Sequence, residues 1–106
     1  MCGICGIIDF SGKQIQNSDI IDMTDAMIHR GPDDEGVFIH KNIGIGMRRL
    51  SIIDLVSGKQ PISNADDSIY VVLNGEIYNH VELRKELIKS GHVFKTNSDT
   101  EILVHL

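Results

Sequence analysis

The chain has 106 residues, which is enough for one domain at most. Its hydrophobic content of 42% and charged content of 24% are ordinary for a globular protein. A net charge of −5 argues against a general nucleic-acid-binding protein, because such proteins need a basic face. No apolar run approaches the roughly 18 residues of a membrane span, and no basic region precedes the amino-terminal apolar run as it would in a secretory signal. Two closely spaced cysteines make a poor disulfide framework, so a reducing, cytoplasmic setting fits best.

The first half of the chain predicts a strand, a helix and two more strands. Residues 2–9 form an apolar run that is typical of a buried strand. Ser18 has the chemistry of a helix N-cap, and the helix ends before residues 29–36, where glycine and proline interrupt regular structure. Further strands are expected at 37–40 and 43–47. The buried stripe of the helix would consist of Ile20, Met23, Met27 and Ile28.

The second half of the chain predicts a hairpin that follows a set of loops. The apolar run 69–73 is typical of a strand that is buried on both faces. Asn74 and Gly75 then give a strong hairpin-turn signal. Residues 76–78 would therefore return as the second strand of the hairpin.

Two capping-box patterns predict the remaining helices. Asn79 and Glu82 have the spacing of such a box and open a helix that stops at Gly91. The same spacing at Ser98 and Glu101 opens a third, short helix.

The amino terminus carries the most reactive group of the chain. If Met1 is removed, Cys2 becomes the first residue and carries both a thiol and a free α-amine. Such an amine has an unperturbed pKa of about 7.7–8.0, and a nucleophile activated by its own terminal amine is a known form of covalent catalysis. Alternatively, Cys2 packs as a small apolar residue in an early strand. Together with Cys5 it also forms half of a redox or zinc motif, but the sequence has no second Cys or His pair to complete one.

Arg49 follows a strand in which larger apolar residues alternate with small ones. A period of two would place its side chain on the same face as Ile45 and Met47. An arginine on an apolar face needs an anion, because an unpaired buried charge is too costly. That anion would be a substrate carboxylate held by two hydrogen bonds or an internal Asp or Glu, unless a bulge turns Arg49 to solvent.

Three further places carry polar groups that suit either chemistry or structure. The Asn74 side-chain N–H and the Gly75 backbone N–H are the donor types that build an oxyanion hole, although a tight turn explains the pair equally well. Asp99 either complements a helix dipole or receives a substrate ammonium group. His29 and Arg30 suggest a catalytic base, but a loop of this kind more often uses such residues to anchor the backbone.

Five short motifs occur in order along the chain, at 1–6, 29–33, 49–54, 74–79 and 98–101. They read Met-Cys-Gly-Ile-Cys-Gly, His-Arg-Gly-Pro-Asp, Arg-Leu-Ser-Ile-Ile-Asp, Asn-Gly-Glu-Ile-Tyr-Asn and Ser-Asp-Thr-Glu. Together they resemble class II glutamine amidotransferase domains, and more closely the amino-terminal glutaminase domain of glutamine-hydrolysing asparagine synthetases. The third motif favours this branch, because the related domains of glucosamine-phosphate synthases and purine-pathway amidotransferases carry a different motif there.

The resemblance implies an α+β fold of the N-terminal nucleophile hydrolase type, a four-layer α-β-β-α sandwich that is incomplete at its carboxyl end. It implies that Cys2 is the nucleophile, that Asn74 and Gly75 hold the oxyanion, and that Asp99 binds the glutamine α-ammonium. Arg30 matches a loop residue with a supporting role. The residues that match the remaining glutamine contacts are Arg49, which would bind the α-carboxylate, and Leu50, Ser51, Ile52, Ile53 and Glu76.

By the same resemblance, residues 1–106 form part of a glutamine amidotransferase type 2 domain from which Met1 is removed, while the rest of the domain and a synthetase domain are absent. Glutamine hydrolysis would supply ammonia for ATP-dependent asparagine synthesis from aspartate. No cofactor is expected in this segment, which has no metal-ligand spacing and no phosphate-binding loop. ATP and Mg²⁺ would belong to the absent synthetase domain.

The expected partners are L-glutamine and the synthetase domain, or a separate chain that supplies the acceptor site. A homodimer is also compatible with the resemblance, whereas neither nucleic acid nor a membrane is expected. Two alternatives stay open on the sequence alone. The ammonia goes to another acceptor, or the chain is an inactive fragment that pairs with a separate chain.

Overall fold

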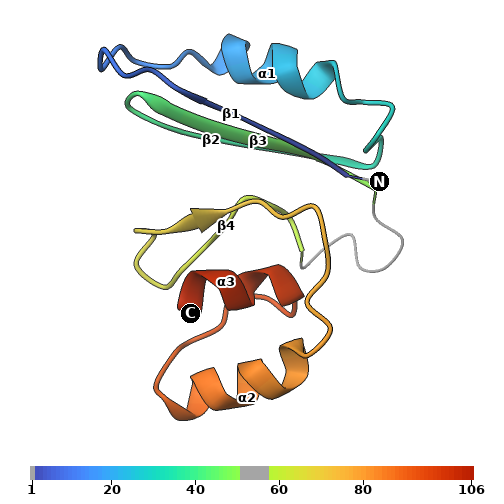
Figure 1. Cartoon of the computed structure of the whole chain (residues 1–106), viewed down its shortest axis with the longest axis vertical. Coiled ribbons are helices and arrows are strands. Elements are labelled where there is room, and N and C mark those ends of the chain that lie inside the picture. Colours follow the sequence, from blue (N-terminus) through green and yellow to red (C-terminus); the bar gives the residue numbers. More distant parts are fainter. Residues whose placement is uncertain (1, 51–57) are drawn as a thin grey trace.

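The structure, a computed structural model, describes residues 2–50 and 58–106 (Figure 1). These residues form helices and two small antiparallel sheets, so the fold class is α+β, as expected. The larger sheet contains β1 (Gly3–Ile8), β2 (Asp34–His40) and β3 (Ile43–Arg49) in the order β1-β3-β2.

Helix α1 (Asn17–Asp25) covers one face of the larger sheet (Figure 1). Strand β3 turns its glycines toward this helix, because a Cβ at either Gly44 or Gly46 would lie 2.8 Å from the Ile20 side chain. Ile20 and Thr24 of α1 are completely buried between the helix and the sheet. The absence of side chains at the two glycines therefore lets α1 pack directly on the strand.

The opposite face of the larger sheet lies against the second half of the chain. There β4 (Ile62–Ser63) pairs with β5 (Tyr70–Val71) to form the smaller sheet. Phe38 of β2 stacks on Tyr70, with ring centroids 3.6 Å apart. The β2 backbone also touches the backbone before β4, since a Cβ at Gly36 would lie 1.5 Å from the Gln60 carbonyl oxygen.

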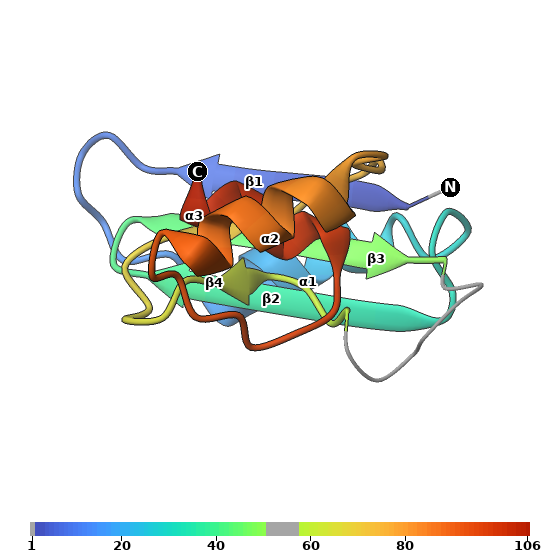
Figure 2. The same cartoon turned by 90° about the horizontal axis from the view of Figure 1, so that it is seen from below.

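Beyond the smaller sheet lie the remaining helices, as Figures 1 and 2 show from two directions. The 3-10 helix η1 (Asp99–Glu101) continues into α3 (Ile102–His105), and α2 (His80–Lys89) lies on the outside. Among the residues that the structure describes, the buried apolar side chains are those of Ile15, Ile20, Met47, Ile62, Ile102 and Val104.

The first-half strands match the predicted ones with corrections to their burial and length. Strand β1 is not buried on both faces, because Ile4 is 49% exposed and Ile8 54% exposed. Strand β2 begins three residues earlier than predicted and β3 continues two residues further. In this extension Glu35 faces Arg48 and forms an ion pair with it at 2.8 Å, which supports the added pairing.

The start and end of α1 also differ from the prediction. Ser18 lies inside the helix, and Gln16 is the N-cap residue. The Asp19 carboxylate accepts the Gln16 backbone N–H at 3.2 Å, so the capping box begins two residues before the predicted cap. Of the predicted apolar stripe, Ile20 is fully buried, but Ile28 lies beyond the helix and is 45% exposed.

The predicted hairpin at Asn74 and Gly75 is wrong. Strand β5 uses only two residues of the run 69–73, which is at most half-buried, and the described residues 76–78 do not form a returning strand. The cause is a contact from far along the chain. The Ile77 backbone N–H donates to Asp99 Oδ2 at 2.8 Å rather than to a neighbouring strand.

The two predicted carboxyl-terminal helices are confirmed, but only part of their predicted capping is. Gly91 follows α2 with a φ of 97°, whereas the Asn79 side chain forms no capping hydrogen bond. Ser98 does cap the third helix, because its Oγ accepts the Thr100 backbone N–H at 3.2 Å. Glu101 does not complete that box, since its carboxylate binds the preceding loop.

The N-terminal nucleophile hydrolase sandwich, and its incompleteness, stay predictions.

Candidate functional site

Cys2 lies immediately before β1, half-buried, on the face of the larger sheet opposite α1. Its neighbour Gly3 faces the helix side, because a Cβ there would lie 2.8 Å from Met27 Sδ. Successive residues of an extended strand point to opposite faces, so Cys2 points away from α1. The register of β1 and β3 ends at the pair Gly3 and Arg48. Cys2 and Arg49 are therefore the chain neighbours of this last pair, one on each side of it.

Arg30 holds the backbone of Cys2 from the loop that follows α1. Its Nε donates to the Cys2 carbonyl oxygen at 3.2 Å. The next residue, Gly31, lies directly on β3, since a Cβ there would be 2.4 Å from the Arg49 backbone nitrogen, and its carbonyl accepts Arg48 Nε at 2.9 Å. The loop is therefore fixed to the strand, and Arg30 lies beside Cys2 as a backbone anchor.

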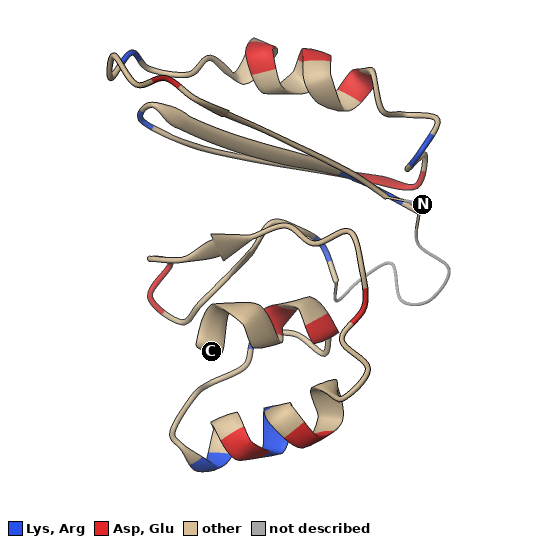
Figure 3. Cartoon of the chain, viewed as in Figure 1, with Lys and Arg blue, Asp and Glu red and all other residues tan. Residues whose placement is uncertain are grey.

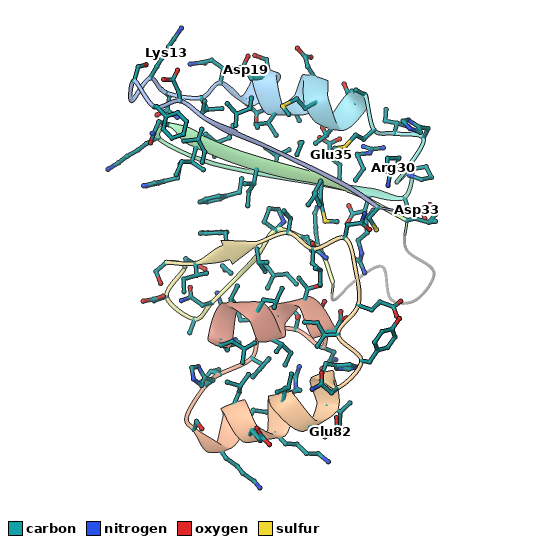
Figure 4. All side chains as sticks on the ribbon, in the orientation of Figure 1. Lys13, Asp19, Arg30, Asp33, Glu35 and Glu82 are labelled. Atoms are coloured by element: carbon teal, nitrogen blue, oxygen red, sulfur yellow. The ribbon has the colours of Figure 1, made fainter. Side chains whose placement is uncertain are left out.

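Charges of both signs meet at this end of the larger sheet (Figure 3). Figure 4 shows Arg30, Asp33 and Glu35 near one another here. The Thr24 hydroxyl donates to Glu35 Oε1 at 3.2 Å on the α1 face, where Arg48 pairs with the other carboxylate oxygen. Arg48 is thus engaged on the helix side, and Arg49 is the arginine on the Cys2 side.

Arg49 ends β3 on the same face as Met47, as the alternating pattern predicted. Its side chain is half-buried and extends to the segment before β4, where a Cβ at Gly58 would lie 2.5 Å from Arg49 Nη2. Leu50, which follows it, is 41% exposed. The predicted contacts Ser51, Ile52 and Ile53 lie outside the described residues.

A second group of predicted residues lies between β5 and η1. Asn74, Gly75 and Glu76 form an exposed bend. The bend is held at both ends, because the Leu73 N–H donates to Gln60 Oε1 at 2.7 Å and the Ile77 N–H donates to Asp99 Oδ2 at 2.8 Å. These bonds place Asp99 next to the bend. In the described part of the chain, no hydrogen bond joins Cys2 directly to this group.

Gln60 and Glu101 hold the second group in place, and neither was predicted from the sequence to do so. Glu101 is completely buried, and its carboxylate accepts the Lys95 N–H at 2.6 Å and the Thr96 N–H at 2.7 Å. It also contacts His105 Nε2 at 3.3 Å. Burial raises the pKa of Glu101, but hydrogen bonds led by the Thr96 hydroxyl outweigh this effect and lower the pKa. The only local signal for Glu101 was its capping-box spacing from Ser98, and this spacing predicted a hydrogen bond to the Ser98 backbone rather than to the loop.

Cys5 is the matched thiol on the other face of β1. Its Sγ lies 3.6 Å from the Gly46 carbonyl oxygen, toward α1. Burial raises the pKa of the Cys5 thiol, and the hydrogen bond to Gly46 lowers it by less, so its reactive thiolate is disfavoured. Both cysteines are free.

Among the residues that the structure describes, no group of three or more His, Cys, Asp or Glu side chains is placed to hold a metal ion. No helix within these residues is long and apolar enough to cross a membrane.

Comparison with known proteins decides the family. The sequence pattern of the glutamine amidotransferase domain family matches residues 1–106. The chain belongs to this family. The resemblance inferred from the five motifs is therefore confirmed.

Relatives of this amidotransferase domain are proteins named glutamine-hydrolyzing asparagine synthetases. Asparagine synthetase 2 of Bacillus subtilis (strain 168) is 49% identical over 109 residues, which cover 100% of this chain and 14% of that protein. Asparagine synthetase 1 of the same organism is 44% identical over 98% of this chain and 17% of its own length. The Sandersonia aurantiaca protein is 44% identical over 100% of this chain and 20% of its own length. The chain thus spans a fifth or less of the length of these relatives.

Proposed function

We propose that the chain hydrolyses glutamine to glutamate and ammonia, with Cys2 as the nucleophile. The observation that carries the proposal is the position of Cys2, whose carbonyl oxygen accepts a hydrogen bond from Arg30 and which precedes the strand pair of Gly3 with Arg48, the neighbour of Arg49. A thiol and a guanidinium on one face suit a substrate with an amide at one end and a carboxylate at the other. Membership of the glutamine amidotransferase family supports glutamine as that substrate.

The reaction begins once Met1 has been removed. The Cys2 α-amine takes the thiol proton, and the sulfur attacks the side-chain amide carbon of glutamine. The Asn74 side chain and the Gly75 N–H stabilise the tetrahedral oxyanion. The protonated amine gives its proton to the leaving nitrogen, so that ammonia departs and a thioester remains. Water, deprotonated by the same amine, then attacks the thioester, which releases glutamate and restores the thiol.

The two ends of the amino-acid backbone of glutamine bind to opposite charges. Arg49 holds the α-carboxylate, and Asp99 binds the α-ammonium. One Asp99 oxygen already accepts the Ile77 N–H, but an ionised carboxylate has about four acceptor sites and so retains capacity for the ammonium. Leu50, Ser51, Ile52, Ile53 and Glu76 line the remainder of the glutamine site.

We further propose that residues 1–106 are part of a type 2 amidotransferase domain of the N-terminal nucleophile hydrolase type within an asparagine synthetase. The names of the relatives support this proposal. A synthetase domain, or a separate chain, then uses the ammonia with ATP and Mg²⁺ to convert aspartate to asparagine. Two free cysteines suit a cytoplasmic location.

Replacement of the nucleophile tests the proposed function in the full-length protein. Cys2→Ala is expected to lower the glutamine-dependent rate by about 10⁴-fold or more, because the covalent step is lost, while synthesis from free ammonia continues. Glutamate release and asparagine formation are measured with each nitrogen source.

The matched control is Cys5→Ala, which removes the thiol of β1 that faces α1 and leaves glutamine use intact. Intact-mass measurement of the wild-type protein should show that Met1 is absent. Glutamine-dependent synthesis that survives Cys2→Ala, or a retained or blocked Met1 in the active protein, would contradict the proposal.

A further inference from the structure

We propose that Gln60 is a positioning residue that fixes the oxyanion segment relative to the ammonium-binding Asp99. This inference rests on the proposed function, because it assigns Gln60 a task in that same site. Gln60 precedes β4 and is 7% exposed. No motif pointed to it, and it touches none of the atoms that would react.

The Gln60 amide connects the two parts of the second group. Its Oε1 accepts the Leu73 N–H at 2.7 Å, one residue before Asn74. Its Nε2 donates to Thr100 Oγ1 at 3.3 Å, one residue after Asp99. A single planar side chain therefore links the residue beside the oxyanion donor to the residue beside the ammonium partner.

The backbone around Gln60 connects the same group to the larger sheet. The Gln60 carbonyl oxygen lies where a Cβ of Gly36 would be, so β2 and Gln60 are in direct backbone contact. Two residues earlier, Gly58 contacts the Arg49 guanidinium. Because β2, β3 and β1 pair in register, this contact places the second group relative to the sheet end that carries Cys2.

The chemistry of a glutamine suits this position because the two partners have different requirements. The Leu73 N–H needs an acceptor, and the Thr100 hydroxyl receives a donated hydrogen. One amide supplies an acceptor and a donor on the same rigid group. Leucine has a similar shape but supplies neither, so the bend that begins at Leu73 and the turn at Thr100 would each lose a fixed partner.

The test uses Gln60→Leu, Thr100→Val and the double variant in the full-length protein, with Thr100→Ser as the conservative variant. Misplacement by about 1 Å costs roughly 100-fold in rate, so each of the first two changes is expected to lower kcat/KM for glutamine by about that factor. The double variant should lose no more than the worse single variant, because both changes break one connection. Thr100→Ser keeps the hydroxyl and should keep glutamine use.

Two further measurements separate misplacement from unfolding. Synthesis from free ammonia and alkylation of Cys2 by iodoacetamide should stay within about threefold of wild type, since neither requires the oxyanion segment. Three results would overturn the assignment of Gln60. The losses of kcat/KM in the two single variants could multiply in the double variant, or Thr100→Ser could lose as much kcat/KM as Thr100→Val. The rate of Cys2 alkylation could also fall together with kcat/KM. Unchanged glutamine kinetics in Gln60→Leu would also overturn this assignment. In that case the proposed function would still stand, provided that Cys2→Ala abolishes glutamine use.

Discussion

At the scale of single residues, glycines occur here for different physical reasons. Gly75 does not need to be glycine for folding, because its φ is not positive and a Cβ would make only ordinary contacts, the nearest at 3.5 Å with Leu73 Cδ1. Gly91 has open space around it but a φ of 97°, which side chains rarely adopt. Of these two positions, Gly91 therefore requires glycine for its backbone conformation, and Gly75 does not.

Replacement of Gly75 by alanine should impair glutamine use without impairing the fold. If the Gly75 N–H approaches the substrate closely, an added methyl group displaces the substrate, and kcat/KM for glutamine should fall by about 100-fold. The melting temperature should change by no more than about 2 °C. Glutaminase kinetics and thermal unfolding of the same preparations measure the two effects.

Gly91→Ala is the matched control, with the opposite expected outcome. It should destabilise the protein by about 1–2 kcal/mol through its left-handed conformation, with glutamine kinetics unchanged. Wild-type glutamine kinetics in Gly75→Ala would mean that the substrate does not approach this position.

Local periodicity in the sequence predicts the position of a candidate site residue where strand geometry alone sets that position. Arg49 ends on the Met47 face because strand alternation alone decides the face. Gln60 was missed because its two partners lie 13 and 40 residues away, and no local pattern records such a separation. The hairpin at Asn74 was wrong for the same reason, since Asp99, 22 residues after Ile77, takes the N–H that a strand would have used.

At the scale of elements, the contact between β2 and the segment before β4 sets how the two sheets meet. This contact depends on the missing side chain at Gly36, where a Cβ would lie 1.5 Å from the Gln60 oxygen and 2.6 Å from its carbonyl carbon. Backbone atoms cannot rotate away as a flexible side chain does. Local propensity predicted the strands of the larger sheet and the helices, but it did not predict this contact or the smaller sheet.

Gly36→Ala should consequently separate the two sheets and destabilise the protein by about 3 kcal/mol or more, at the upper end of the usual cost of overpacking. Urea unfolding of the wild-type and variant proteins measures the difference. The control is Gly6→Ala in β1, where a Cβ would lie 3.4 Å from the nearest atom, the Gly44 carbonyl oxygen. That change should stay within about 0.5 kcal/mol. A Gly36→Ala variant as stable as Gly6→Ala would contradict the backbone contact.

At the scale of the whole molecule, the second half is fixed by a buried polar group as well as by apolar packing. Glu101 connects the loop at Lys95 and Thr96 to α3 through His105, and it lies in the same short helix as Asp99. The stabilisation that Glu101 provides depends on its ionisation, because only the charged carboxylate accepts all of these hydrogen bonds at once. The fold of this half is therefore expected to depend on pH.

The direction of that dependence follows from the lowered pKa of Glu101. Hydrogen bonding makes the folded-state pKa lower than the ordinary value of 4.5, so the group contributes stability above that value and loses it as pH falls through the folded-state pKa. Glu101→Gln should therefore be markedly less stable than wild type at pH 7, and the difference should narrow below about pH 4. Urea unfolding at both pH values measures the difference.

Asp67→Asn is the surface control, because Asp67 is 59% exposed and pairs with Lys95 at 3.0 Å. The pKa of Asp67 is also lowered, first by the Ser63 hydroxyl, so the sign of its pH dependence is the same. Water and salt screen this exposed pair, so its effect should be smaller and should decrease further in 1 M NaCl, whereas the effect of Glu101 should persist. A difference between Glu101→Gln and wild type that is equal at both pH values would show that the Glu101 carboxylate does not require its charge to hold the loop.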